Sequence, residues 1–128
     1  HVREGEVSQR MPLRERLGIS HEPLLRVIER MENNLENPVR RTDLARLSNV
    51  SLRQLERLFR LFLHSSIGDY YLRLRLDRAR DLLRQTSMSI RETALACGFS
   101  SASHLSRAGR SRFGHPPRAE RMQVKLSH

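Results

Sequence analysis

The sequence predicts an all-α protein of about seven helices, with two helix-turn-helix units joined by a long connecting helix. Three observations support this fold class. Apolar residues recur at spacings of three and four along most of the chain. No stretch alternates with period two for long enough to indicate a strand. One segment also matches a later one after a single insertion, which indicates an internal repeat.

Residues 1–20 are expected to form a linker or arm, because they are polar, aperiodic and interrupted by Gly5, Pro12 and Gly18. Residues 21–128 are expected to form the folded domain. Its leading helix follows Ser20, and Asn37-Pro38 ends the apolar periodicity. The apolar positions of this helix are Leu24, Val27, Ile28, Met31 and Leu35.

The first helix-turn-helix unit is predicted at about residues 42–63. A short helix after Thr42, with Leu44, Ala45 and Leu47 as its apolar positions, ends at a tight break at Asn49-Val50. Ser51 has the spacing of an N-cap with Gln54 three residues later. The helix that follows has a face predicted to be buried, formed by Leu55, Leu58, Phe59 and Phe62. Its opposite, polar stripe consists of Arg53, Glu56, Arg57 and Arg60.

A connecting helix is predicted at about residues 67–85 and a second unit at about 89–113. Ser89 and Glu92 have the spacing of a capping box, and Gly98 closes the short helix that they open. The next helix runs from about 101 to 113 and ends at Gly114, before Pro116-Pro117.

The repeat places the same residue types at the same points of both units. At an offset of 49, the matched pairs are Ala45 with Ala94, Ser48 with Cys97, Asn49 with Gly98, and Val50 with Phe99. After one inserted residue, the pairs are Ser51 with Ser101, Leu55 with Leu105, Arg57 with Arg107, Arg60 with Arg110, and Leu63 with Phe113. Each copy is therefore a short helix, a break and a longer helix with arginines on its outer face.

The net charge is +10, and arginine supplies 23 of the 24 basic residues. Residues 1–38 carry a net charge of −1, whereas residues 39–128 carry +11. Such a surface either solubilises the protein or binds a polyanion, and arginine favours the second because its fork pairs with phosphates and guanine edges. A membrane surface fits less well, since no single amphipathic helix collects the charge.

Segment 39–122 resembles the AraC/XylS-type DNA-binding domain of bacterial transcription regulators. The motifs that carry the resemblance are Leu44-Ala45; Ser51-Leu52-Arg53-Gln54-Leu55-Glu56-Arg57-Leu58-Phe59; Arg75-Leu76, Ala79-Arg80 and Leu82-Leu83; and Ile90, Ala94, Gly98-Phe99-Ser100-Ser101, Ser103-His104-Leu105-Ser106-Arg107, Phe113-Gly114 and Pro117. The wordings QRMPLRERLG, RQLERLF and RLRLDRARDLL are most similar to the branch with a DJ-1/PfpI-like, amidotransferase-related sensor domain.

The resemblance implies sequence-specific binding of double-stranded DNA in the bacterial cytoplasm, at the nucleoid, with RNA polymerase as a further partner. It also implies an effector-sensing domain before His1. The residues expected to read bases are Arg53, Glu56, Arg57, Ser103, His104, Ser106 and Arg107. Those expected to contact phosphate are Ser51, Arg60, Ser101 and Arg110.

Several of these residues have a second interpretation. Glu56 accepts from a cytosine, orients a neighbouring arginine, or pairs with Arg60 and only stabilises the helix. His104 reads a base or is simply exposed. Cys97 is expected in the core rather than in a redox sensor, and Tyr70 and Tyr71 in the core rather than in base stacking.

Two residues depart from the family pattern and from the first copy of the repeat. Gly109 stands where an aromatic residue is usual and where the first copy has Phe59, and Glu120 stands where tyrosine is usual and the first copy has Tyr70. Loss of a buried aromatic side chain typically costs about 3–5 kcal/mol. The second unit is therefore expected to be under-packed unless another residue, such as Met122, fills the space.

The connecting helix has the length needed to hold two recognition helices in adjacent major-groove segments. Nineteen residues span about 28 Å at 1.5 Å per residue, against about 34 Å per turn of the duplex. The alternative functions are an adaptor that binds acidic proteins and a general polyanion binder, while RNA binding lacks the stacking aromatics. No phosphate loop, nucleophile elbow or carboxylate pair supports an enzyme, and no cofactor or metal site is expected.

Overall fold

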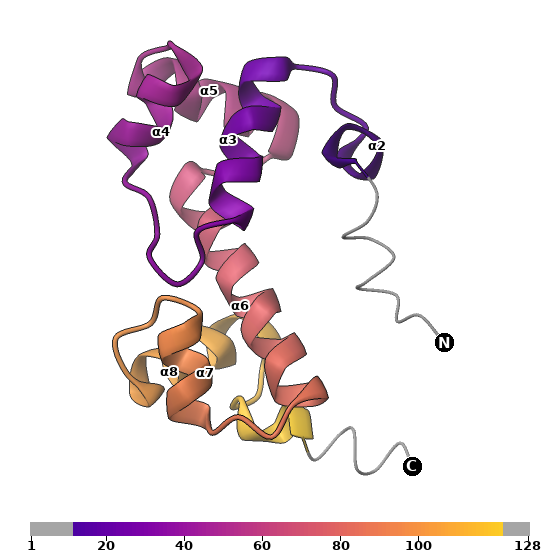
Figure 1. The fold of residues 1–128 in the computed structure, drawn as a ribbon, viewed down its shortest axis with the longest axis vertical. Coiled ribbons are helices and arrows are strands. Elements are labelled where there is room, and N and C mark those ends of the chain that lie inside the picture. Colours follow the sequence, from indigo (N-terminus) through magenta and orange to yellow (C-terminus); the bar gives the residue numbers. More distant parts are fainter. Residues whose placement is uncertain (1–11, 122–128) are drawn as a thin grey trace. The chain divides into compact units, whose positions relative to one another are not determined.

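A computed structural model describes residues 12–121, and it confirms the all-α class. Seven helices have both ends within these residues, and no strand occurs among them. They are α2 (Leu13–Leu17), α3 (Glu22–Glu32), α4 (Arg41–Ser48), α5 (Leu52–Leu63), α6 (Ile67–Gln85), α7 (Ile90–Ala96) and α8 (Ala102–Phe113) (Figure 1). Within the described residues, the chain divides into two compact units, residues 12–33 with 39–67 and residues 34–38 with 68–121.

Helix α3 provides much of the core of the first unit. Its N-cap is His21, whose Nδ1 atom accepts a hydrogen bond from the Leu24 N–H at 3.2 Å. The helix buries one apolar face, formed by Leu24, Leu25, Val27, Ile28 and Met31. It ends at Glu32 with Asn33 as its C-cap, well before Pro38, so Leu35, which was predicted to be an apolar position of this helix, lies outside it.

The prediction of a linker before residue 21 is wrong for residues 13–19. Helix α2 ends at Gly18, which has φ of +66°. This is the left-handed conformation, which glycine adopts readily. Arg16 forms two hydrogen bonds with the carboxylate of Glu32 on α3, at 2.8 and 3.2 Å. Ile19 is buried. Short-range periodicity missed this segment because five helical residues are too few to repeat a pattern.

The turn of the first unit forms as the sequence predicts. Asn49 ends α4 in the left-handed conformation, with φ of 58°. The hydroxyl oxygen of Ser51 accepts a hydrogen bond from the Gln54 N–H at 3.0 Å and caps α5. Leu55, Leu58 and Phe59 are buried, but Phe62, which was predicted on the same face, is 38% exposed, and its ring lies 5.5 Å from that of His21, centroid to centroid.

The second unit is built around one hydrophobic cluster on α6, α7 and α8. Its buried members are Leu76, Ala79, Ala94, Cys97, Phe99 and Leu105. The predicted capping box opens α7: Ser89 and Glu92 each bond the other's backbone N–H, at 2.9 and 3.2 Å. Tyr70 and Tyr71 are buried as predicted, and the Tyr71 hydroxyl donates to the carbonyl of Asn34.

The described residues fill the space expected beside Gly109. Pro117 is buried over it: a Cβ atom added at Gly109 would lie 3.5 Å from the Pro117 Cγ. The cavity lined by these two residues, Phe113 and Glu120 measures only about 10 Å³. The predicted under-packing is therefore wrong, because Pro117 packs against Gly109 and little space is left between them. Met122 lies outside the described residues.

Glu120 replaces the usual tyrosine with a buried ion network. The residue is 1% exposed, and its carboxylate contacts Arg84 at 2.7 Å, Arg80 at 3.4 Å and the ring of His115. The Arg80 guanidinium also lies over the Phe113 ring, 3.6 Å from its centroid. Burial alone would raise the pKa of Glu120, but the hydrogen bond from His115 and the two arginine charges outweigh it and hold the pKa below its usual value.

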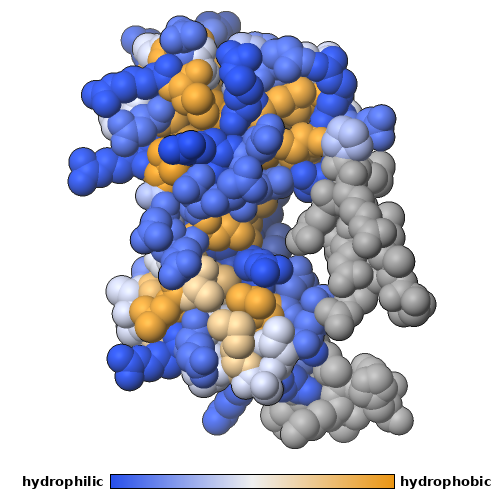
Figure 2. Space-filling model, in the orientation of Figure 1, coloured by the Kyte–Doolittle hydropathy of each residue, from blue (hydrophilic) through white to orange (hydrophobic). Residues whose placement is uncertain are grey.

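None of the described helices is long and apolar enough to cross a bilayer. Hydrophilic residues cover most of the face drawn in Figure 2, with apolar residues visible between them.

Candidate nucleic-acid interface

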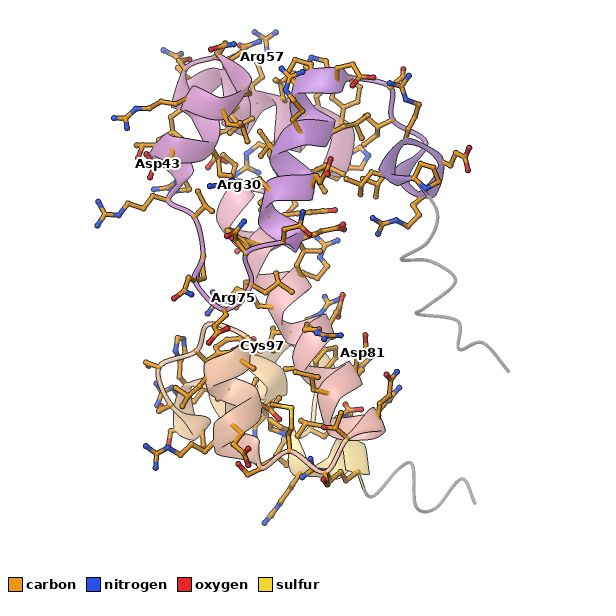
Figure 3. The ribbon with its side chains drawn as sticks, in the orientation of Figure 1. Arg30, Asp43, Arg57, Arg75, Asp81 and Cys97 are labelled. Atoms are coloured by element: carbon orange, nitrogen blue, oxygen red, sulfur yellow. The ribbon has the colours of Figure 1, made fainter. Side chains whose placement is uncertain are left out.

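Helix α5 presents three arginines on its outer face. Arg53, Arg57 and Arg60 are exposed, on the side opposite Leu55 and Phe59. Figure 3 shows Arg57 at the outer edge of its unit. Within residues 12–121, none of the three guanidinium groups is held by an acidic partner. All three are therefore available to an external anion.

Glu56 lies on the same polar stripe but turns toward its own unit. One carboxylate oxygen contacts Nη1 of Arg41 on α4 at 3.3 Å, and the other accepts a hydrogen bond from the Ile67 N–H at 3.2 Å. Ile67 is the first residue of α6, where free N–H groups favour a negative charge. The carboxylate does not pair with Arg60, because Arg41 and the start of α6 already hold both oxygens.

The outer face of α8 carries fewer charges. Ser103, Arg107 and Arg110 are exposed, whereas Leu105 and Gly109 face the core and Ser106 is half-buried. Arg107 and Arg110 have no acidic partner among the described residues. The repeat therefore places arginine pairs on both helices, but only α5 has an additional arginine in its first turn.

His104 is partly used by the turn before α8. Its ring packs edge-on against Phe99, with centroids 5.1 Å apart and an interplanar angle of 86°. Nδ1 lies 3.4 Å from the Ser100 N–H and 3.3 Å from the Ser100 hydroxyl. With Nδ1 as the acceptor, the ring's proton sits on Nε2, which leaves one donor for a ligand.

The two serines that open α5 and α8 act as N-caps. Ser51 accepts from the Gln54 N–H and Ser101 from the His104 N–H, both at 3.0 Å. Each hydroxyl keeps its own proton for donation, and both side chains are exposed. A phosphate at either site would meet this donor and the remaining N–H groups of the helix start.

Arg75, to which the sequence analysis gave no individual role, holds the turn of the second unit. Its guanidinium donates to the carbonyls of Cys97 at 2.9 Å and Gly98 at 2.7 Å, and lies 4.3 Å from the Phe99 ring centroid. Figure 3 shows Arg75 beside Cys97. Partial burial lowers the pKa of Arg75. In the sequence, Arg75 is marked only by its place in the Arg75-Leu76 motif of the family resemblance.

Cys97 is fully buried under this turn. Burial raises the pKa of its thiol to about 11, although the charges of Arg78 and Arg75 oppose the shift. A buried thiol of high pKa lacks the accessible thiolate of redox sensors. The residue contributes to the core, as the sequence predicts.

Comparisons with known proteins agree with this geometry. A family model described as a helix-turn-helix domain matches residues 44–123. The HTH-type transcriptional regulator GbdR of Pseudomonas aeruginosa is 52% identical over 125 residues, which cover 98% of this chain and 34% of GbdR. The HTH-type regulator ArgR of the same species is 48% identical over 122 residues, which cover 95% of this chain and 37% of ArgR.

The chain is also similar to solved structures of helix-turn-helix regulators. The crystal structure of an AraC-type transcriptional regulator from Chromobacterium violaceum matches with a TM-score of 0.79 and 47% identity, over 84% of this chain and 96% of that one. The DNA-binding domain of AdpA, solved in complex with target DNA, matches with a TM-score of 0.78 and 27% identity, over 83% and 96% of the two chains.

Two helix-turn-helix units with basic outer faces define a DNA-binding domain. The chain belongs to the AraC-type family of helix-turn-helix transcription regulators. It spans about a third of the length of the curated relatives that it matches.

Proposed function

We propose that α5 and α8 are the two recognition helices of this domain, each placed in a major groove. The observation that carries the proposal is the set of exposed arginines without acidic partners on both outer faces. The likeness to the AdpA domain in its DNA complex supports it. Arginine is suited to this role because its fork donates two hydrogen bonds to one base or phosphate.

The residues divide into readers and phosphate contacts by their place on each helix. Readers lie in the first two turns, where a recognition helix meets base edges: Arg53, Arg57, Ser103, His104, Ser106 and Arg107. Phosphate contacts lie at the helix starts or one turn further along: Ser51, Arg60, Ser101 and Arg110. We assign Glu56 to positioning α5, because Arg41 and Ile67 hold its carboxylate.

The test uses duplexes selected from a random library by the domain itself. Arg57→Ala and Arg107→Ala should each cost about 1–3 kcal/mol and relax the preference at one base pair. Arg60→Ala and Arg110→Ala should weaken binding to selected and scrambled duplexes equally and reduce the salt slope by about one. Identical behaviour of the four variants would contradict the division into readers and phosphate contacts.

The alternatives predict different titrations. A general polyanion binder would show a steep salt dependence with equal affinity for selected and scrambled duplexes. An adaptor for acidic proteins would prefer an acidic peptide to DNA at matched ionic strength. Specific retention of the selected duplex at 150 mM salt would exclude both.

We further propose that the domain is the DNA-binding part of a longer regulator, because its curated relatives are about three times as long. In that regulator an effector-sensing domain of the DJ-1/PfpI-like type precedes the chain, RNA polymerase is a partner, and the protein acts at the nucleoid in the cytoplasm. α6 would connect two recognition helices in adjacent groove segments, since its 19 residues span about 28 Å.

A further inference from the structure

The outer faces of α5 and α8 differ at one matched position. In the repeat, Arg53 corresponds to Ser103 and Arg57 corresponds to Arg107. All four residues are exposed. The first two turns of α5 therefore present two guanidinium groups, whereas the same turns of α8 present one.

The two arginines of α5 are not neutralised within the described part of the chain. Side chains three or four residues apart on a helix can pair. Glu56 is therefore within reach of Arg53, three residues before it, but not of its direct neighbour Arg57. Its carboxylate is held instead by Arg41 and the Ile67 N–H. Both guanidinium groups thus keep all their donors for DNA.

Arginine reads guanine more readily than any other base, because its two parallel N–H groups match the O6 and N7 acceptors in the major groove. Residues four apart on a helix are separated by about 6 Å along its axis, close to two base-pair steps of about 3.4 Å. Arg53 and Arg57 can therefore reach two different base pairs at once.

We propose that α5 reads two guanines that lie within about two base-pair steps of each other, on either strand, and that α8 reads a single guanine through Arg107. Ser103 adds no fixed preference, because a hydroxyl both donates and accepts. The His104 ring is restrained by Phe99 and Ser100. The recognition site is thus asymmetric, and it fixes the direction in which the domain lies on DNA. This inference rests on the proposed role of α5 and α8 as recognition helices.

The experiment is selection of duplexes from a random library, followed by sequencing and binding titrations of single-base variants. The expected site has a guanine pair in one half and a lone guanine in the other. Arg53→Ala and Arg57→Ala should each abolish the preference for guanine at one member of the pair. That preference is expected to be about 5- to 150-fold in the wild-type domain. Arg107→Ala should do so only at the lone guanine.

A gain-of-function variant gives the sharpest test. Ser103→Arg gives α8 two arginines four residues apart, as α5 has. It should create a second guanine preference in the α8 half of the site. Arg26→Ala is the charge-matched control for the arginine-to-alanine variants, because it also removes one positive charge from an exposed position, here on α3, and should leave every base preference unchanged. All substituted side chains are exposed, and circular dichroism checks that the helices remain folded.

The outcomes separate this inference from the proposed function. Enrichment of no sequence at all would overturn the recognition-helix assignment itself. Enrichment of a site whose guanines are indifferent to Arg53→Ala, Arg57→Ala and Ser103→Arg would overturn the guanine inference and leave DNA binding in place. Loss of one guanine for each arginine removed, and gain of one for Ser103→Arg, would establish it.

Discussion

The side chain of Glu56 accepts a hydrogen bond from the backbone N–H of Ile67 at 3.2 Å and so joins α5 to the first residue of α6. Its other oxygen contacts Arg41 on α4 at 3.3 Å. One side chain thereby fixes three helix segments of the first unit. The same bonds direct the only acidic side chain of α5 away from the three arginines on its outer face.

Replacement of Glu56 should therefore affect stability rather than base preference. Glu56→Ala leaves the Ile67 N–H and Arg41 without their acceptor, and it should lower the free energy of unfolding by about 1–2 kcal/mol. Urea denaturation measures this loss. A relaxed preference at one cytosine, with unchanged stability, would instead show that Glu56 reads a base.

Two substitutions of Gly109 should change the stability of the protein in opposite directions. A Cβ atom at this position would lie at an ordinary contact distance of 3.5 Å from Pro117. Gly109→Ala should therefore stabilise the protein by up to about 1 kcal/mol, because alanine favours the helix interior. Gly109→Phe should destabilise it by about 1–3 kcal/mol, since the cavity beside Gly109 measures only about 10 Å³ and a ring placed there would have to displace its neighbours. Thermal unfolding of both variants tests the packing, and a stabilising Gly109→Phe would contradict it.

The ion network of Glu120 should make stability depend on pH. Glu120→Gln keeps the shape of the side chain but removes the charge that faces Arg80 and Arg84. At pH 7 we expect a loss of about 1–2 kcal/mol, because both arginines remain partly solvated.

The sign of the pH effect follows from the lowered pKa of Glu120. Stability from such a group is present above its unfolded-state pKa of about 4.3 and is lost as the pH falls through the lower folded-state value. The difference in unfolding free energy between the wild-type protein and Glu120→Gln should therefore shrink below about pH 4. A difference that stays constant from pH 7 to pH 3 would show that the charge contributes nothing.

The turns of the two units differ in how strictly they need glycine. Gly98 has φ of +81°, and a Cβ atom there would clash with the carbonyl oxygen of Leu35. Gly98→Ala should cost about 2 kcal/mol or more, through backbone strain and this clash. Asn49 holds the matched place with φ of 58°, and Asn49→Gly should be neutral or slightly stabilising. Hydrogen exchange of residues 90–113 should accelerate only in Gly98→Ala.

The local structure of this protein is encoded in short stretches of its sequence. Capping serines, a glycine or asparagine at each turn and apolar residues three and four apart specify α4 to α8, because these signals act between residues close in the chain. The outward position of the arginines on α5 and α8 follows from the same periodicity. Phe62 is the exception, since the periodicity predicts it on the buried face and it is 38% exposed.

Contacts between residues far apart in the sequence are decided by the tertiary structure alone. Glu32 holds Arg16 and so places α2, Arg41 and Ile67 turn Glu56 inward, and Arg75 holds the carbonyls before α8. Pro117 covers Gly109, and two arginines from α6 make a buried Glu120 tolerable. No local sequence pattern predicts these contacts. A buried charge, or a gap left by a small residue, is tolerated only when a residue from another segment of the chain pairs with it or fills it.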